Sequence, residues 1–377
     1  MQKIFLRIYA FFYRVFLKRI FFLLDPEFIH ESIMTYGEKL GNFSFSRFLI
    51  RKIFFTQNKS LNQEIAGIKF SNPIGLAAGF DYQGQLTQIL PNLSFGFQTI
   101  GTITNQSYEG NLKPRLGRLS KSKSLMVNKG FKNPGIKAII KKLQKSQFET
   151  PVGLSIGQTN SAKEMAQGKA IEDIVDTFKI AESAKAPFSY YELNISCPNL
   201  FSKVSFYPPK NLKVLLEAVT ALKLKIPLFI KMPIEQTDGE TMKMLDVIVD
   251  FPTAGVIFGN LQKNRKDKTL NPDEVKRFPA GNFSGKPTEQ RSNELIALAY
   301  KKYGKRLVII GCGGIFSAKD AYQKIKLGAT LVQLITGLIF EGPQLVAQIN
   351  LELPRLLKKD GFNQIYEAVG TGAKLRS

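Results

Sequence analysis

The feature that most constrains the fold is a repeated alternation of short apolar segments with helical patterns from residue 74 onward. The segments typical of strands are residues 74–79, 96–101, 152–157, 190–195, 227–232, 254–259, 307–311 and 330–335. Helical spacing of apolar residues occupies several of the intervals, such as residues 171–184, 211–224, 293–303 and 317–327. Eight such units predict an α/β fold in which eight parallel strands close into a (β/α)8 TIM barrel. An open, doubly wound sheet is the alternative.

Small or polar residues stand at the carboxyl end of nearly every expected strand. They are Ala77, Ala78, Gly79, Thr102, Ser155, Asn194, Lys231, Gly259, Asn260, Gly313, Gly314 and Thr336, and the apolar Ile335 is the exception at these ends. Because these ends meet at one face of a barrel, they predict a single shared site, with phosphate bound after the last two strands. Lys231 ends an apolar strand, where an unpaired ammonium is costly. It should therefore face an anionic or electron-rich group, or form a buried salt bridge.

The most informative stretch is residues 190–199, an apolar strand that ends in Asn194, Cys197 and Asn199. Asparagine amides offer donors and acceptors to a planar, amide-rich ring, and a thiol between them can take a proton or attack. A buried turn whose asparagines satisfy their own backbone is the alternative. The chain has one histidine and two cysteines. This composition argues against a disulfide framework, a histidine-based metal site and a histidine triad, so no metal is expected.

The amino-terminal 24 residues combine a Phe-rich face with basic residues at helical spacing, namely Lys3, Arg7, Arg14 and Lys18. The charges interrupt the segment too often for a membrane-spanning helix, and the pattern is typical of a helix lying on an anionic membrane surface. A helix packed on the protein's own body is the alternative. Asp25 and Pro26 predict the start of a second helix that contains His30 and ends near residue 41.

The net charge of +23 favours an anionic partner. Zinc-finger spacing, arginine-glycine tracts and basic-aromatic arrays are missing from the sequence, so nucleic acid is not expected. We divide the chain into a membrane-associating helical segment at residues 1–41, a linker at 42–70 and the barrel at 71–377.

Several motifs in combination resemble the dihydroorotate dehydrogenase family. They are residues 72–81 (NPIGLAAGFD), 194–199 (NISCPN), 281–287 (GNFSGKP), 311–314 (GCGG) and 331–334 (LVQL). Residues 24–27 (LDPE) together with His30 resemble the amino-terminal helix pair of the membrane-associated, quinone-linked class. The resemblance implies FMN-dependent oxidation of dihydroorotate to orotate in pyrimidine synthesis, with quinone as electron acceptor. It also implies a peripheral membrane protein, which we expect at the cytoplasmic face of a bacterial inner membrane.

The resemblance also assigns roles to residues. Cofactor-binding positions are Ala77, Ala78, Gly79, Thr102, Ser155, Asn194, Lys231, Gly259, Gly285, Gly313, Gly314, Ile335 and Thr336. Asn128, Asn194, Asn199 and Asn260 would hold the pyrimidine, and Cys197 would remove the C5 proton as C6 delivers hydride. Quinone would enter near His30 and Arg118.

This sequence departs from the family pattern at several of these places. Cys197 stands where the quinone-linked class has serine, Tyr82 where the family has a lysine, and Ser155 where it has asparagine. The loop at residues 128–131 is shorter than its family counterpart. We therefore consider two alternative hypotheses. One is a related FMN barrel with another substrate or acceptor, and the other is a catalytically inactive barrel bound to a membrane surface.

Overall fold

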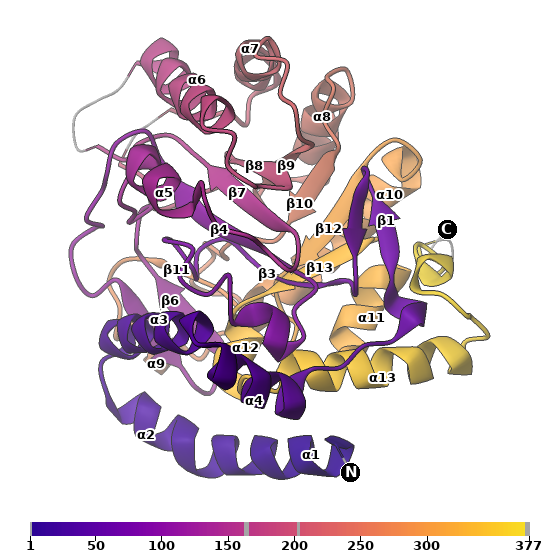
Figure 1. The fold of residues 1–377 in the computed structure, drawn as a ribbon. Coiled ribbons are helices and arrows are strands. Elements are labelled where there is room, and N and C mark those ends of the chain that lie inside the picture. The colour runs from indigo at the N-terminus through magenta and orange to yellow at the C-terminus, as the bar shows by residue number, and fades with distance from the viewer. Residues whose placement is uncertain (1, 162–165, 202–203, 374–377) are drawn as a thin grey trace.

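A closed barrel of eight parallel strands forms the centre of the protein (Figure 1). The computed structural model describes residues 2–161, 166–201 and 204–373. The barrel strands are β3 (Ile74–Leu76), β4 (Phe97–Ile103), β7 (Val152–Ile156), β8 (Tyr190–Asn194), β9 (Leu228–Met232), β10 (Gly255–Phe258), β12 (Val308–Cys312) and β13 (Leu331–Leu334). They follow one another around the barrel in chain order, and β13 closes it against β3. The predicted TIM barrel is confirmed.

Helices cover the outside of the barrel. They are α5 (Ile136–Leu143), α6 (Gln167–Ser183), α7 (Pro209–Thr220), α8 (Asp238–Ile248), α10 (Glu289–Tyr303), α11 (Ala318–Lys326), α12 (Thr336–Glu341) and α13 (Leu345–Lys359). Local sequence explains several starts: Thr237 and Glu240 form a capping box at α8, and the Ser317 side chain caps α11. Between β3 and β4, the 3-10 turn η3 (Leu90–Leu93) stands in the place of a longer helix.

Alternate residues of each strand point into the barrel and divide its interior into layers. Phe97, Tyr190 and Phe229 fill the end of the barrel at which the strands begin. Ile65 and Phe70 close that end, on the hairpin of β1 (Gln63–Ile65) and β2 (Ile68–Phe70). On β8 the buried Tyr190 and Glu192 are followed by Asn194. The interior thus changes from an apolar floor to a polar mouth.

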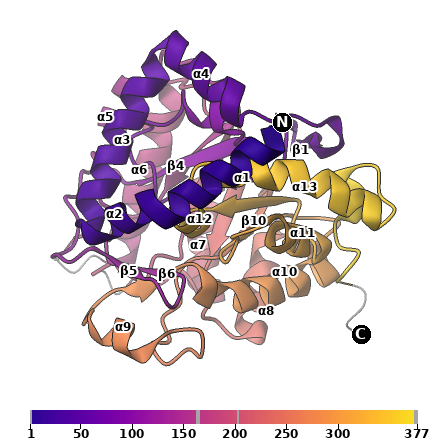
Figure 2. The same cartoon turned by 90° about the horizontal axis from the view of Figure 1, so that it is seen from below.

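Helices also precede the barrel. They are α1 (Gln2–Phe12), the π-helical turn η1 (Tyr13–Leu17), α2 (Lys18–Leu23), α3 (Pro26–Asn42) and α4 (Ser44–Phe54). Asp25 caps α3 by accepting hydrogen bonds from the backbone N–H groups of Glu27 and Phe28, and Pro26 follows it, as the sequence predicted. Seen from below, α1 and α2 run across the molecule beside α13 and α12 (Figure 2).

One face of α1 packs on the protein itself. Leu6 and Ala10 are buried, and Leu6 lies in an apolar cluster with Phe54 of α4 and Ala347 of α13. Two residues of the predicted basic stripe form ion pairs with the barrel helices: Lys3 with Glu352 of α13 at 3.4 Å, and Arg14 with Glu341 of α12 at 3.2 Å. The α1 helix is therefore fixed to the barrel by both apolar and ionic contacts.

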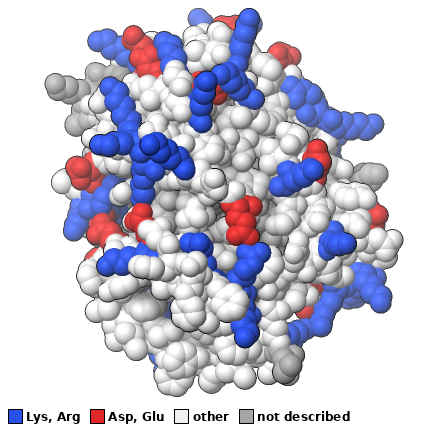
Figure 3. Space-filling view, in the orientation of Figure 1, with Lys and Arg blue, Asp and Glu red and all other residues white. Residues whose placement is uncertain are grey.

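The opposite face of this helical segment is apolar and exposed. All but four of the exposed large hydrophobic side chains in the described residues lie between Ile4 and Leu49. In Figure 3 the lower left of the molecule, near α2 and α3 in Figure 1, shows few charged side chains. Within residues 2–161, 166–201 and 204–373, the structure contains no helix with the length and hydropathy needed to cross a membrane.

A small antiparallel sheet lies beside the barrel mouth and was not predicted. It consists of β5 (Leu116–Leu119), β6 (Ser124–Val127) and β11 (Asn282–Phe283). The helix α9 (Pro272–Lys276) precedes β11, and Glu274 of α9 accepts hydrogen bonds from Lys121 and Ser122 in the β5–β6 turn. These contacts hold the small sheet in place beside the barrel mouth, and with it the start of the loop that follows β6.

Candidate active site

A cavity of about 690 Å³ extends from the barrel mouth to the underside of the amino-terminal helices. At the barrel end it is lined by Asn194, Cys197, Asn199, Lys231 and Asn260. At the helical end it is lined by Tyr9, Tyr13, Leu17, Phe21, Phe22, Ile29, His30, Ile33 and Tyr36. One continuous space therefore joins a polar, amide-rich chamber to an apolar channel.

A chain of buried polar groups forms the base of the chamber. Thr102 and Ser155 are hydrogen-bonded through their hydroxyls at 3.0 Å, and Ser155 donates to Glu192 Oε1 at 3.0 Å. The Nζ of Lys231 lies 3.3 Å from the same carboxylate oxygen. Burial alone lowers the pKa of Lys231, but the Glu192 carboxylate outweighs it and holds this pKa above its ordinary value. Lys231 thus lines the cavity and also forms the buried salt bridge that was the alternative.

Two of the predicted pyrimidine-binding residues are joined through Ser196. The Asn194 amide donates to Thr102 Oγ1 at 2.8 Å, and its Oδ1 accepts from the Ser196 hydroxyl at 3.0 Å. Asn260 Nδ2 donates to the Ser196 hydroxyl at 2.6 Å. The strand ends of β8 and β10 therefore hold their amides in fixed orientations.

Asn199 is held in place by the small sheet. Its Nδ2 donates to the Val127 carbonyl at 3.1 Å, and its Oδ1 accepts from Asn282 at 2.7 Å. Asn111 donates both to the Asn199 carbonyl at 2.9 Å and to Asn128 Oδ1 at 3.0 Å. Asn128 lies in this supporting layer and is not among the residues that line the large cavity.

Cys197 lines the cavity between these asparagines. Burial raises the pKa of its thiol to about 12, although Lys231 and Lys263 act in the opposite direction. In the free protein at neutral pH, the thiol therefore carries its proton.

A smaller pocket of about 90 Å³ adjoins the chamber. It is lined among others by Ala77, Gly259, Gly285, Gly313, Gly314, Ile335 and Thr336. Gly285, Gly313 and Gly314 have φ values of 81°, 95° and 73°, a region that residues with a Cβ rarely adopt. The Thr336 and Ser284 hydroxyls, 2.8 Å apart, add polar groups. A pocket of glycine backbone and hydroxyls suits a phosphate.

Comparison with known proteins agrees with this geometry. The model of the family "Dihydroorotate dehydrogenase" matches residues 60–357. This chain belongs to the dihydroorotate dehydrogenase family. The dihydroorotate dehydrogenase (quinone) of Trichodesmium erythraeum is 33% identical over 365 residues, which cover 93% of this chain and 95% of the relative. That of Sulfurovum sp. is 35% identical over 359 residues, covering 95% and 98%.

Solved structures of dihydroorotate dehydrogenases have the same fold. The crystal structure of DHODH from Eimeria tenella in complex with ferulenol superimposes with a TM-score of 0.79 at 25% identity. The match covers 94% of this chain and 96% of that one. The resemblance inferred from sequence motifs, including the quinone-linked class, is therefore confirmed.

FMN is the cofactor of quinone-linked dihydroorotate dehydrogenases, and the residues present here fit it. Gly79, at the barrel mouth, is exposed to the cavity with φ 109°. A Cβ at Gly79 would have only Ile335 Cδ1 within 4 Å, at 3.8 Å, so open space lies over this backbone. A flat ring can lie there beside Ala78, Thr102 and Lys231, with its phosphate in the glycine pocket.

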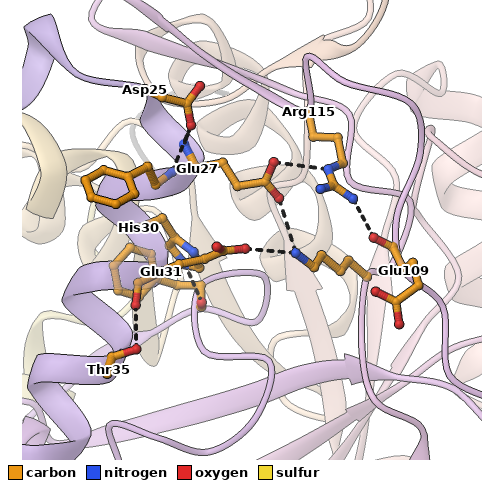
Figure 4. A network of polar contacts seen from close by, with 10 residues as sticks. Asp25, Glu27, His30, Glu31, Thr35, Glu109 and Arg115 are labelled. Carbon is orange, nitrogen blue, oxygen red and sulfur yellow. Dashed lines mark hydrogen bonds and ion pairs between the residues drawn. The ribbon is translucent and has the colours of Figure 1, made fainter.

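His30 and Arg118, expected at the quinone entrance of this dihydroorotate dehydrogenase, both line the apolar channel. His30 Nε2 bonds the Phe80 carbonyl at 2.8 Å, while Nδ1 is buried without a hydrogen-bond partner (Figure 4). Burial and the nearby Lys129 lower the pKa of His30 to about 3, so the ring is neutral and Nδ1 is a free acceptor. Arg118 donates to the Leu24 carbonyl at 2.7 Å and lies over the Phe22 ring.

Three residues of the site were not identified from the sequence. Glu192 could have been found, because it precedes Asn194 by two positions and strand alternation places both inside the barrel. Asn111 and Lys129 lie in irregular loops, where no periodic signal predicts the direction of a side chain. Their neighbours come from distant parts of the chain, such as Asn199 for Asn111 and Tyr82 for Lys129.

Proposed function

We propose that this protein oxidises dihydroorotate to orotate and passes the electrons to a membrane quinone, as a step of pyrimidine synthesis. The observation that carries the proposal is the single cavity that joins Cys197 and the asparagines to the apolar channel at His30. A polar chamber suits the pyrimidine, an apolar channel suits a lipid-soluble acceptor, and the space over Gly79 lies between them.

In the chamber, the protein's own groups orient the pyrimidine and take one proton. FMN, when bound, would supply the hydride acceptor for C6 and the two-electron link to the quinone. The asparagine amides present donors and acceptors to the ring, which fixes C5 against the thiol. Cys197 then takes the C5 proton as a general base, and solvent finally receives it. Only the thiolate can act as this base, and the raised pKa means that a small fraction of Cys197 is ionised at neutral pH. The same raised pKa makes that thiolate a stronger base.

In the channel, residues 1–41 form the access route for the quinone. The apolar walls from α1, α2 and α3 accept an isoprenoid or naphthoquinone body. In this proposal the His30 ring, which lines the channel and whose Nδ1 is itself buried, accepts a hydrogen bond from the hydroquinone hydroxyl through Nδ1, and Arg118 provides positive charge in the same channel. The neutral state of His30 supports this role, because a charged ring could not accept.

The exposed apolar face of the amino-terminal helices supports peripheral binding to an anionic membrane. A helix that is held to the barrel on one side and bears phenylalanines on the other suits the membrane interface. The net charge of +23 adds attraction to acidic lipid headgroups. The cytoplasmic face of a bacterial inner membrane is the location that joins a pool of quinone to soluble dihydroorotate.

Anaerobic titration of the flavin tests the proposal. Protein purified in mild detergent should be yellow, bleach on addition of dihydroorotate, and regain its colour on addition of a short-chain ubiquinone. A yellow protein that dihydroorotate leaves oxidised would contradict the substrate assignment. Bleaching followed by re-oxidation with fumarate or NAD but not with quinone would contradict the acceptor.

A further inference from the structure

We propose that Lys129 is the residue that binds the carboxylate of the pyrimidine substrate. This inference rests on the proposed function and adds a specificity residue to its site.

Lys129 is a buried cation without an anionic partner. Its exposed fraction is 5%, and it lines the large cavity. Among the described residues, its ammonium forms neither a hydrogen bond nor an ion pair; its one polar contact is with the face of the Tyr82 ring, 4.6 Å from the ring centroid. A buried ammonium with so little compensation is costly, which favours an anionic ligand.

The other basic side chains that line the cavity are already engaged. Lys231 pairs with Glu192, Arg118 donates to the Leu24 carbonyl, and Lys132 pairs with two glutamates. The cavity is lined by these three and Lys129. Among the described lining residues, Lys129 is therefore the one lysine without a carboxylate partner. Arg118 also has none in the described part of the chain, but it lies at the helical end of the cavity, over the Phe22 ring.

The nearest acidic residues cannot serve Lys129, because other cations occupy them (Figure 4). Glu27 is bonded by Arg115 at Oε2, 3.1 Å, and by Lys132 at Oε1, 3.3 Å. Glu31 is bonded by Lys132 at 2.9 Å. The network on α3 thus satisfies its own charges and leaves Lys129 facing the cavity.

The backbone around Lys129 is held by the same groups that build the chamber. Asn199 donates to the carbonyl of Val127, and the Asn111 backbone N–H donates to that of Lys129 at 3.3 Å. Asn160 donates to the carbonyl of Gly130 at 3.1 Å. These bonds hold the backbone of residues 127–130 beside Asn199, which limits the positions that the Lys129 side chain can take.

The ionisation of Lys129 is consistent with an incoming anion. Burial, reinforced by Lys132, lowers its pKa to about 7, against the attraction of Glu27. A bound carboxylate would raise this pKa again, so orotate affinity should fall as pH rises above about 7. The other charged or titratable groups around the ammonium are His30, Glu31, Tyr82 and Arg115.

The test compares orotate and uracil, which lacks the carboxylate, on the FMN-loaded protein. Their dissociation constants are measured by calorimetry or by the perturbation of the flavin spectrum. Lys129→Met should weaken orotate binding about 10- to 150-fold, the range for losing a hydrogen bond to a charged group. Uracil binding should not change. Since an uncompensated charge is removed, the Tm without orotate should be equal or higher, whereas a merely structural lysine would lower it.

Lys137→Met is the matched control. It removes the same charge from an exposed position on α5, away from the residues that line the cavity and from the Glu27 network. Orotate affinity should persist in this variant, with its decline above pH 7, while Lys129→Arg should bind orotate without that decline.

Three results would overturn the assignment. Equal orotate affinity in wild type and Lys129→Met would remove Lys129 from the substrate site while leaving the proposed function intact. An unchanged orotate constant with a raised quinone KM would place Lys129 in the acceptor channel instead. Failure of the wild type to bind orotate, or to be bleached by dihydroorotate, would overturn the proposed function and this assignment together.

Discussion

The ammonium of Lys231 lies 3.3 Å from the Glu192 carboxylate, and the two side chains are 5% and 0% exposed. They come from neighbouring strands, β9 and β8. Lys231 stands beside Asn194 in the strand register, and its ammonium reaches back to Glu192, two positions earlier on β8. Ser155 donates to the same carboxylate oxygen, while Glu192 Oε2 has no hydrogen-bond partner among the described residues. Lys231, the cation expected at the polar edge of the flavin, is therefore largely neutralised by Glu192.

Glu192→Gln should destabilise the protein, because it leaves a buried ammonium uncompensated. We expect the free energy of unfolding to fall by about 3 kcal/mol, as for breaking other buried pairs. Denaturant titration of the FMN-free protein measures it. Asp176→Asn, which breaks the exposed pair with Lys179, is the control and should cost less than about 1 kcal/mol. An equal, small loss of unfolding free energy in both variants would show that the buried pair stabilises the protein no more than the exposed pair does.

The rate of flavin reduction should increase with pH, because Cys197 acts only as thiolate and burial raises its pKa to about 12. At subsaturating dihydroorotate, where the ionisation of the free enzyme governs the rate, the second-order rate constant should rise about tenfold per pH unit from pH 7 to 10. Anaerobic stopped-flow absorbance measures it. Cys197→Ala should bind FMN normally, lose this dependence and reduce the flavin about 100- to 10,000-fold more slowly. Unchanged reduction in that variant would exclude the thiol as the base.

His30→Phe should impair only the quinone half of the reaction. The ring keeps its edge contact with Phe80, but the free Nδ1 acceptor and the bond to the Phe80 carbonyl are lost. We expect kcat/KM for quinone to fall about tenfold, the effect of one hydrogen bond. Flavin reduction by dihydroorotate should be unaffected. Thr35→Ala, on the exposed side of α3, should leave both half-reactions unchanged; similar losses in the two variants would point to a general disturbance of the helix.

Replacing Phe5, Phe12 and Phe16 by serine should release the protein from membranes. Each phenylalanine is about half exposed on the amino-terminal helices, and its insertion into lipid is worth on the order of 1 kcal/mol or more. Cosedimentation with vesicles containing phosphatidylglycerol should fall about 100-fold or further. Leu112→Ser is the control, because Leu112 is 87% exposed but lies outside these helices. Equal sedimentation of all three proteins would contradict the assigned membrane face.

The parts of the fold that were predictable have a strong local signal. Each barrel strand is a short apolar run flanked by turn residues, and Asp25 with Pro26 marks the start of α3 without reference to the rest of the chain. Strands β6 and β11 carry no such signal, since they are short and their partners lie far apart: Phe283 pairs with Met126. The expected linker at 42–70 likewise contains α4 and the β1–β2 hairpin, which the barrel stabilises by packing.

The residues of the candidate site likewise fall into those that the sequence predicted and those that it did not. The strand ends identified Cys197, Asn194, Asn260 and Lys231, because any parallel barrel brings them together. The partner of Lys231 was left open between a ligand and a salt bridge. The structure shows a contact with Glu192, two positions before Asn194, which is the register partner of Lys231. Lys129 has no ion pair among the described residues because Arg115 and Lys132 already bind Glu27. These residues come from α3, from the position just before β5 and from the loop after β6, so no local pattern predicts the outcome.

The ion pairs of Lys3 with Glu352 and of Arg14 with Glu341 have a consequence for how the protein meets its acceptor. Together with the buried Leu6 and Ala10 they hold α1 and η1 against the barrel. Docking of these helices on a bilayer would therefore set the tilt of the whole molecule, and the channel that they line would face the acyl chains. A quinone then searches for its site by lateral diffusion in two dimensions. Turnover should accordingly scale with the mole fraction of quinone in the lipid, and diluting the same amount of quinone with extra vesicle lipid should slow the enzyme even when the bulk concentration is constant.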